Sequence, residues 1–260
     1  MRDVVRKRGG FLILIAALLG LAACATGSTD PRGNYHLVGE TAEGTAYDGA
    51  ATLTPRGINV LVDWTRPGQL DRAGFALQKD NVLGVATTAQ QSDYAGIVLY
   101  RVEGGKLSGT WAGKGEHAVR RYAYEDLEGA PALEGRYQIT RGENPGGRPA
   151  TYYGQVEIRK TGAVYEVDWS TPVPSYVGTG VLLGNIFVVA YGEKTRPGVA
   201  AYCLTSSDLA EGITVRAGET ATGAEILWRG DTPAPAAADA RLRQLREQHS
   251  VPQCGGGPAQ

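Results

Sequence analysis

The feature that most constrains the fold of this 260-residue chain is an internal duplication. The segment 47–64 recurs at 152–169 with a constant offset of 105 residues, and the Val-Asp-Trp triplet at its end is unchanged. Downstream, 96–100 matches 198–202 in the same order. Each copy spans roughly 100 residues, which exceeds the ~20–50 residues of a solenoid repeat and matches a small domain. We therefore place two β repeats at 33–129 and 130–230.

Within each copy the hydrophobic pattern predicts strands. In 58–64 and 165–169 apolar and polar residues alternate with a period of two, which is typical of a half-buried strand. Pro-Arg-Gly at 55–57 and Lys-Thr-Gly at 160–162 indicate tight turns between such strands. Counting these signals gives about eight short strands per copy, the pattern of a small antiparallel barrel or sandwich. The fold class we expect is all-β.

A helical pattern occurs only near the C-terminus. Residues 237–248 carry two leucines among arginines and predict one short helix. The segment 231–260 is thus expected to hold a linker, this helix and a disordered tail. The 37 glycines and 13 tyrosines, against three phenylalanines, also suit a turn-rich β protein with half-buried aromatic side chains.

The repeated unit resembles one found in tandem in poorly characterised bacterial exported proteins. The shared pattern runs from Gly-x-Tyr at 33–35, through Tyr-x-Gly, Val-x-Trp and Gly-x-x-x-Tyr, to Gly-x-Trp at 109–111. The second copy departs from that ending with Gly-Ile-Thr at 212–214. The resemblance covers 33–228 and implies a fold rather than an activity.

The N-terminus has the organisation of a secretory signal. Four basic side chains lie within residues 1–8, and an apolar run extends from Phe11 to Ala23. This run is shorter than the ~20 residues that cross a bilayer as a helix, so it fits a cleaved signal peptide over 1–23.

The signal ends in Leu21-Ala22-Ala23-Cys24, which resembles the lipobox of bacterial lipoproteins. The resemblance implies that the thiol of Cys24 carries lipid, that cleavage occurs just before it, and that 24–32 is a tether to the membrane. The alternative is an ordinary secretory signal with a cysteine there by chance. By analogy with Gram-negative lipoproteins, Ala25 implies the outer membrane, provided that the host is Gram-negative. We expect a lipid-anchored protein of the cell envelope, facing either the periplasm or the outside.

Charge argues against nucleic acid as a partner. Residues 1–23 contain four of the 26 Lys and Arg and one of the 27 Asp and Glu. The mature chain therefore has 22 basic and 26 acidic side chains, a net charge of about −4, without the basic footprint that nucleic-acid binding needs.

Two cysteines remain after lipidation. Cys203 lies in an expected strand and Cys254 in the Gly- and Pro-rich tail. In an oxidising compartment they either form a disulfide or stay as a buried thiol and a free one.

Catalytic and metal-binding patterns are not apparent in the sequence. The histidines His36, His117 and His249 are isolated, and no nucleophile, phosphate-binding or zinc-binding motif occurs. Asp63 and Asp168 precede tryptophan in both copies. They are a carboxylate pair, two ligand-binding acids inside barrels, or residues that face solvent or a cross-strand partner while the tryptophan faces the core. We expect no enzyme activity, no cofactor and no metal.

The tryptophans of the duplicated triplet, Trp64 and Trp169, either fill the cores or line a ligand cavity. Arg120 and Arg121 with Tyr122 and Tyr124 mark either a surface contact or a solvated strand end. The function we expect is a non-catalytic, membrane-anchored protein with a binding or structural role, toward an unknown protein or small molecule. The alternative is a small-ligand carrier of the lipocalin or avidin type.

Overall fold

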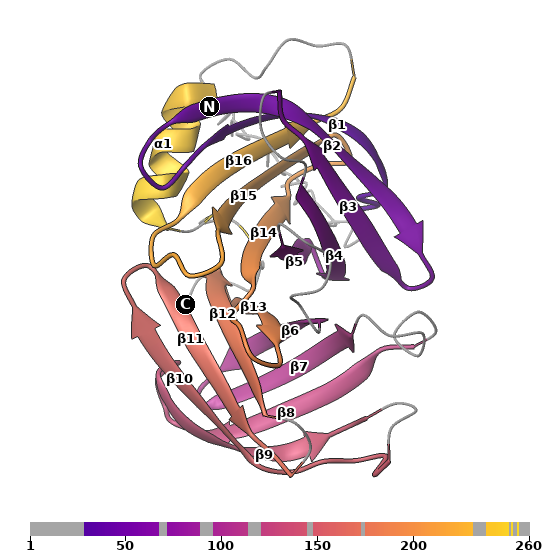
Figure 1. Ribbon diagram of the computed structural model, residues 1–260, viewed down its shortest axis with the longest axis vertical. Helices are drawn as coiled ribbons and strands as arrows, with labels where there is room; N and C mark the ends of the chain where they lie inside the picture. The colour runs from indigo at the N-terminus through magenta and orange to yellow at the C-terminus, as the bar shows by residue number, and fades with distance from the viewer. Residues whose placement is uncertain are drawn as a thin grey trace, which may run out of the picture.

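The computed structural model describes residues 29–67, 72–88, 96–113, 121–144, 148–172, 175–230, 238–249, 251 and 254. The predicted signal peptide, Cys24, His117, Arg120 and the expected linker after residue 230 lie outside these residues. Among the described residues, sixteen strands form two closed antiparallel barrels of eight strands each, and one helix follows them (Figure 1). The all-β prediction, with two eight-stranded barrels and a short C-terminal helix, is confirmed.

One barrel is assembled from the two ends of the described chain, and we call it the split barrel. Its strands are β1 (Gly33–Glu40), β2 (Ala46–Arg56), β3 (Asn59–Thr65), β4 (Arg72–Lys79), β5 (Val82–Thr88), β14 (Gly198–Leu204), β15 (Leu209–Val215) and β16 (Gly223–Trp228).

The other barrel is continuous in sequence and lies between β5 and β14, so we call it the inserted barrel. Its strands are β6 (Gly96–Glu103), β7 (Lys106–Gly113), β8 (Ala123–Gly129), β9 (Gly135–Gly142), β10 (Gln155–Thr161), β11 (Val164–Ser170), β12 (Tyr176–Leu183) and β13 (Ile186–Gly192).

The barrels do not follow the repeats. Strands β1 to β8 belong to the first copy and β9 to β16 to the second, so each barrel takes five strands from one copy and three from the other. Strand β5 pairs with β14 instead of β6, and β13 pairs with β6 instead of β14. Because duplication makes β6 and β14 equivalent, either pairing would turn equivalent positions of the two strands inward, with Tyr100 in the place of Tyr202. The hydrophobic pattern therefore cannot distinguish them.

The barrels pack side by side through strands that are buried on both faces. All seven residues of β14 are buried, and so are residues 186–190 of β13. Burial on both faces explains why these strands read as continuous apolar runs rather than alternating ones. Gly84 permits the close approach, because a Cβ there would lie 2.6 Å from Cγ1 of Val188 and 2.8 Å from Cδ1 of Leu99.

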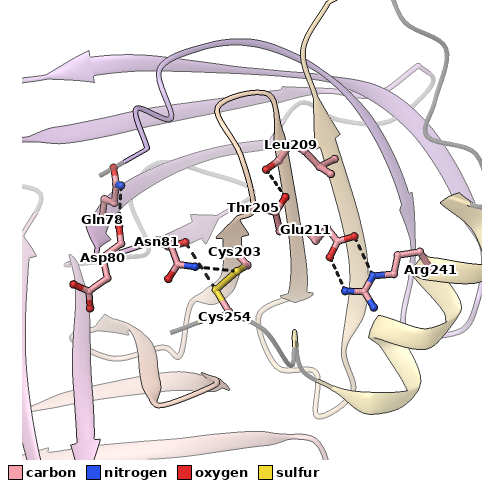
Figure 2. The surroundings of a disulfide bond; sticks show 9 residues. All are labelled: Gln78, Asp80, Asn81, Cys203, Thr205, Leu209, Glu211, Arg241 and Cys254. Carbon is pink, nitrogen blue, oxygen red and sulfur yellow. Dashed lines mark hydrogen bonds and ion pairs between the residues drawn. A yellow bond between two sulfur atoms is a disulfide. The ribbon is translucent and has the colours of Figure 1, made fainter. Parts of the chain in front are cut away.

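The C-terminal segment is fixed to the split barrel. Helix α1 (Ala238–Gln248) buries Leu242 and Leu245 and contacts β16, β1 and β15. Its Arg241 donates hydrogen bonds of 3.0 and 2.6 Å to the Glu211 carboxylate on β15. Beyond it, Cys254 and Cys203 form a disulfide with a Cα–Cα distance of 5.4 Å (Figure 2). Helix and disulfide together cover the outside of β14, β15 and β16.

Candidate binding site at the open end of the split barrel

Each barrel encloses one glutamate, and the two occupy equivalent strands. Glu125 lies on β8 and Glu225 on β16, with relative exposures of 3% and 0%. A fully buried carboxyl group is costly unless it is hydrogen-bonded or paired. These two glutamates are therefore the charged side chains in the barrel interiors that need hydrogen-bond or ion-pair partners.

In the split barrel, three groups hold the Glu225 carboxylate. The hydroxyl of Tyr47 donates a hydrogen bond of 2.7 Å, the hydroxyl of Tyr202 donates another, and Nη2 of Arg72 forms an ion pair at 2.7 Å. Trp64 extends the network, since its indole N–H donates to the Tyr202 hydroxyl at 3.3 Å.

In the inserted barrel, the same types of residue surround Glu125. The hydroxyls of Tyr100 and Tyr152 donate to its carboxyl group, the second at 2.6 Å, and the indole N–H of Trp169 donates at 3.0 Å. Tyr100, Tyr152 and Trp169 are the second-barrel counterparts of Tyr202, Tyr47 and Trp64. The duplication thus preserves a glutamate, two tyrosines and a tryptophan in each interior.

Glycines on neighbouring strands make room for these rings. A Cβ at any of six glycines would approach a network ring to between 2.3 and 3.0 Å, well inside van der Waals contact. The pairs of glycine and ring are Gly39 with Tyr47, Gly74 with Trp64, Gly212 with Tyr202, Gly142 with Tyr152, Gly178 with Trp169, and Gly109 with Tyr100. The glycine and aromatic spacing shared by the two copies therefore encodes this network.

The two networks differ in charge. Arg72 pairs with Trp64 across β3 and β4, whereas the equivalent position opposite Trp169 is Tyr176. Burial opposes ionisation of Glu225, but Arg72 and the donated hydrogen bonds outweigh it and lower the pKa of this carboxyl. With no cation beside it, burial prevails at Glu125 and raises its pKa against three hydrogen bonds.

The charged network opens at the end of the split barrel where β1 ends and β4 begins. Three arginines, Arg66, Arg72 and Arg216, line a small pocket there with Thr41 and Thr214, and we call this end the arginine mouth. The guanidinium of Arg72 stacks over the ring of Trp64 at 4.1 Å, and that of Arg66 over Tyr47 at 5.1 Å. Aromatic faces thus hold both cations in place.

Counting only residues that the structure describes, the arginine mouth has one cation without a paired anion. Arg72 is paired with Glu225, and Arg216 lies 3.6 Å from Glu219. Arg66 makes no ion pair with any described residue, and its buried Nε, like that of Arg72, has no hydrogen-bond acceptor among them. Burial, followed by the positive charge of Arg72, lowers the pKa of Arg66. An anion would supply the missing acceptor and counter-charge.

The residues singled out in the sequence fall in several places. Trp64 and Trp169 face the barrel interiors, where each belongs to a carboxylate network. Asp63 is exposed, and Asp168 accepts hydrogen bonds from Arg159 and Arg196 on the outer surface. The two aspartates therefore do not form a carboxylate pair.

The described histidines are also separate from the networks. His36 stacks on Trp228 outside the split barrel at 5.5 Å, and Nδ1 of His249 lies 2.7 Å from the Thr222 hydroxyl. The glutamates and arginines of the networks were not predicted. The sequence does contain a pattern that could have identified the glutamates. Glu125 follows Tyr100 by 25 residues, and Glu225 follows the equivalent Tyr202 by 23.

Three further findings describe the chain. No group of three or more His, Cys, Asp or Glu side chains suited to a metal ion occurs in the part of the chain that the structure describes. No helix in that part is long and apolar enough to cross a membrane. No family model, no curated protein and no solved structure matches the chain.

Proposed function

We propose that this chain is a non-catalytic, lipid-anchored protein of the cell envelope that binds a small carboxylate at the arginine mouth. The observation that carries the binding role is Arg66, which lies beside Arg72 and has no ion-pair partner among the described residues. A single excess positive charge matches a monoanion, and two planar guanidinium groups suit the planar carboxylate. The signal and lipobox ending at Cys24 support the anchor.

The packing of the interiors weighs against the alternative of a lipocalin-like carrier. Each interior is occupied by a cluster of buried side chains in mutual contact, and Trp64 and Trp169 are members of these clusters. Ligand cavities in small barrels require that such side chains leave space. The binding role is therefore assigned to the barrel end rather than to its interior.

The geometry also favours binding over catalysis. The carboxyl groups of Glu125 and Glu225 accept hydrogen bonds from interior tyrosine and tryptophan side chains and from Arg72, and Tyr47 lies between Glu225 and the mouth. A general acid or base must reach the proton that it transfers. A ligand at Arg66 would meet guanidinium and hydroxyl groups instead.

A titration followed by NMR tests the binding role. Acetate should cause saturable shifts of backbone amides near Thr41 and Thr214, with phosphate and chloride as comparison anions. Arg66→Gln removes the unpaired cation and should weaken acetate binding by about tenfold. Arg243→Gln, on the exposed face of α1, is the matched control and should bind as the unsubstituted protein does. Shifts that do not saturate, or that are equal in Arg66→Gln, contradict the assignment.

A further inference from the structure

Exposed aromatic side chains gather at one end of the inserted barrel. Among the described residues, three large hydrophobic side chains are exposed: Tyr122 at 36%, Tyr124 at 38% and Tyr153 at 72%. Tyr122 and Tyr124 lie where β8 begins, and Tyr153 lies just before β10. Both positions belong to the barrel end at which Glu125 is buried. Three exposed tyrosines at one end, with none described elsewhere, form a surface patch.

This patch is next to the end of the split barrel from which the N-terminal segment leaves. The Tyr122 hydroxyl donates a hydrogen bond of 3.2 Å to the carbonyl oxygen of Ile58, in the turn between β2 and β3 (Figure 1). Strand β1 begins at the same end, since Gly33 pairs with Leu53 near the end of β2. We call this the tether end.

The first described residues are held at the tether end. Nε2 of Gln78 donates a hydrogen bond of 2.9 Å to the carbonyl oxygen of Thr29, and Nη2 of Arg229 donates one of 3.0 Å to that of Asp30. Thr29 is only five positions after Cys24 in the sequence. Fully extended, five residues span at most about 17 Å. A lipid on Cys24 would therefore keep the tether end close to the membrane surface.

The patch carries positive charge in a chain that is net negative. Its surface charges are Arg121, Arg141 and Arg148 against Asp126 and Glu143, a balance of +1, against about −4 for the mature chain. Arg141 stacks over Tyr124 at 4.5 Å and pairs with Glu143. Arg121 and Arg148 are exposed and form no ion pair with a residue that the structure describes. Their charge is available to an anionic surface.

We propose that this patch is a membrane-docking surface that lies on anionic phospholipid headgroups of the bilayer to which Cys24 is anchored. The inference rests on the lipid anchor of the proposed function. Tyrosine is an interfacial residue, with an apolar ring and a polar hydroxyl, and arginine is attracted to lipid phosphates. Because the tether holds the patch near the bilayer, weak contacts between the patch and the lipid headgroups are enough to orient the two barrels.

Docking at the tether end fixes the direction of the arginine mouth. Strand β1 runs from the tether end to Glu40, and Thr41 lies in the lining of the mouth. The mouth is thus at the opposite end of the split barrel. With the tyrosines on the bilayer, it opens away from the membrane, where a dissolved anion reaches it.

Fluorescence quenching by brominated lipid tests the docking surface. The full-length lipoprotein is extracted from membranes, checked by intact mass, and reconstituted in vesicles of brominated phosphatidylcholine with phosphatidylglycerol. Tyr153→Trp preserves an interfacial aromatic residue, and its added fluorescence should fall by at least about half. Glu43→Trp, exposed in the turn between β1 and β2 at the opposite end of the split barrel, is the matched control and should keep its fluorescence.

A charge variant separates the arginines from the tyrosines. Adding Arg121→Gln and Arg148→Gln to the Tyr153→Trp protein should weaken quenching by about twofold or more at low salt, whereas Arg136→Gln at the far end of the inserted barrel should leave it unchanged. An acylated protein in which Tyr153→Trp and Glu43→Trp are quenched equally, or not at all, overturns the docking surface and leaves the anchor standing. A product without acyl groups overturns the anchor, and the docking surface with it.

Discussion

At the scale of single residues, the two buried glutamates show how one substitution changes the behaviour of a duplicated network. The residues around Glu125 and Glu225 are the same apart from Arg72, which stands where the inserted barrel has Tyr176. Removing one partner of a buried ion pair typically costs ~3–5 kcal/mol, because it leaves the other charge uncompensated. Arg72 therefore stabilises an ionised carboxylate in one interior, while the other interior favours the neutral acid.

The two glutamates should give the barrels opposite responses to pH. The pKa of Glu125 is raised on folding, so its contribution is full below the unfolded pKa and is lost as pH rises through the folded pKa. The pKa of Glu225 is lowered, so its contribution is present above the unfolded pKa and is lost as pH falls through the folded one. Glu125→Gln should thus gain free energy of unfolding relative to the unsubstituted protein as pH rises from about 4 to 7.

Urea unfolding of the two variants across this range provides the measurement. Glu225→Gln should lose stability most at neutral pH, because it leaves Arg72 buried without its counter-charge, and the loss should shrink as pH falls through the lowered pKa of Glu225. It is the matched comparison, since it makes the same chemical change at the equivalent position. Two variants with parallel pH profiles would contradict the assigned difference in ionisation.

The residues of the site were only partly predictable. The Val-Asp-Trp triplet identified Trp64 and Trp169 as important, but whether they fill a core or line a cavity depends on contacts between distant strands. Trp64 and Tyr202 are 138 residues apart, and Arg72 and Glu225 are 153 apart. Single-residue patterns carry no information on such pairs, so the carboxylate networks and the arginine mouth required the structure.

At the scale of elements, the C-terminal helix and tail depend on a covalent link. Helix α1 spans Ala238–Gln248, within the expected 237–248, and the disulfide joins Cys203 and Cys254, 51 residues apart in the sequence and on either side of the helix. Such a link restricts the unfolded chain, and losing it costs typically ~2–4 kcal/mol. Cys254 is therefore held to the split barrel by a covalent bond.

Cys254→Ala should lower the free energy of unfolding by ~2–4 kcal/mol, measured by urea denaturation. The unsubstituted protein in reductant should unfold at the same urea concentration as the variant, because both lack only the link. Alkylation without reductant should add no group to Cys203 or Cys254 in the unsubstituted protein, as read by intact mass. If two groups are added, the bridge is absent.

Strands that face water on one side were predictable, and those between the barrels were less so. Apolar and polar residues alternate in 58–64, as expected for β3, which faces solvent on one side only. Strand β14 is apolar throughout because both of its faces are buried. Such a run signals burial but does not say which neighbours cover it. The element count could therefore be predicted, and the pairing of β5 with β14 could not.

At the scale of the whole molecule, the exchange of strands makes the inserted barrel the independent unit. Residues 96–192 contain all eight of its strands, whereas a division between 129 and 130 cuts both barrels into groups of five and three. A complete barrel has no open strand edge, while a partial one leaves two edges unpaired. Folding alone is therefore expected for 96–192 and not for either repeat.

Three fragments test this arrangement by urea unfolding and size-exclusion chromatography. Fragment 96–192 should unfold cooperatively as a monomer, although with lower stability than in the whole chain, because its outward-facing Leu99 and Val188 lose their cover. Fragments 33–129 and 130–230 should each lack a cooperative transition when separate and regain one when mixed, since mixing supplies the three missing strands of each barrel. If each repeat were instead a cooperative monomer by itself, β5 would pair with β6 in the isolated repeat. The pairing of β5 with β14 would then result from joining the two copies in one chain, and not from a greater stability of that pairing.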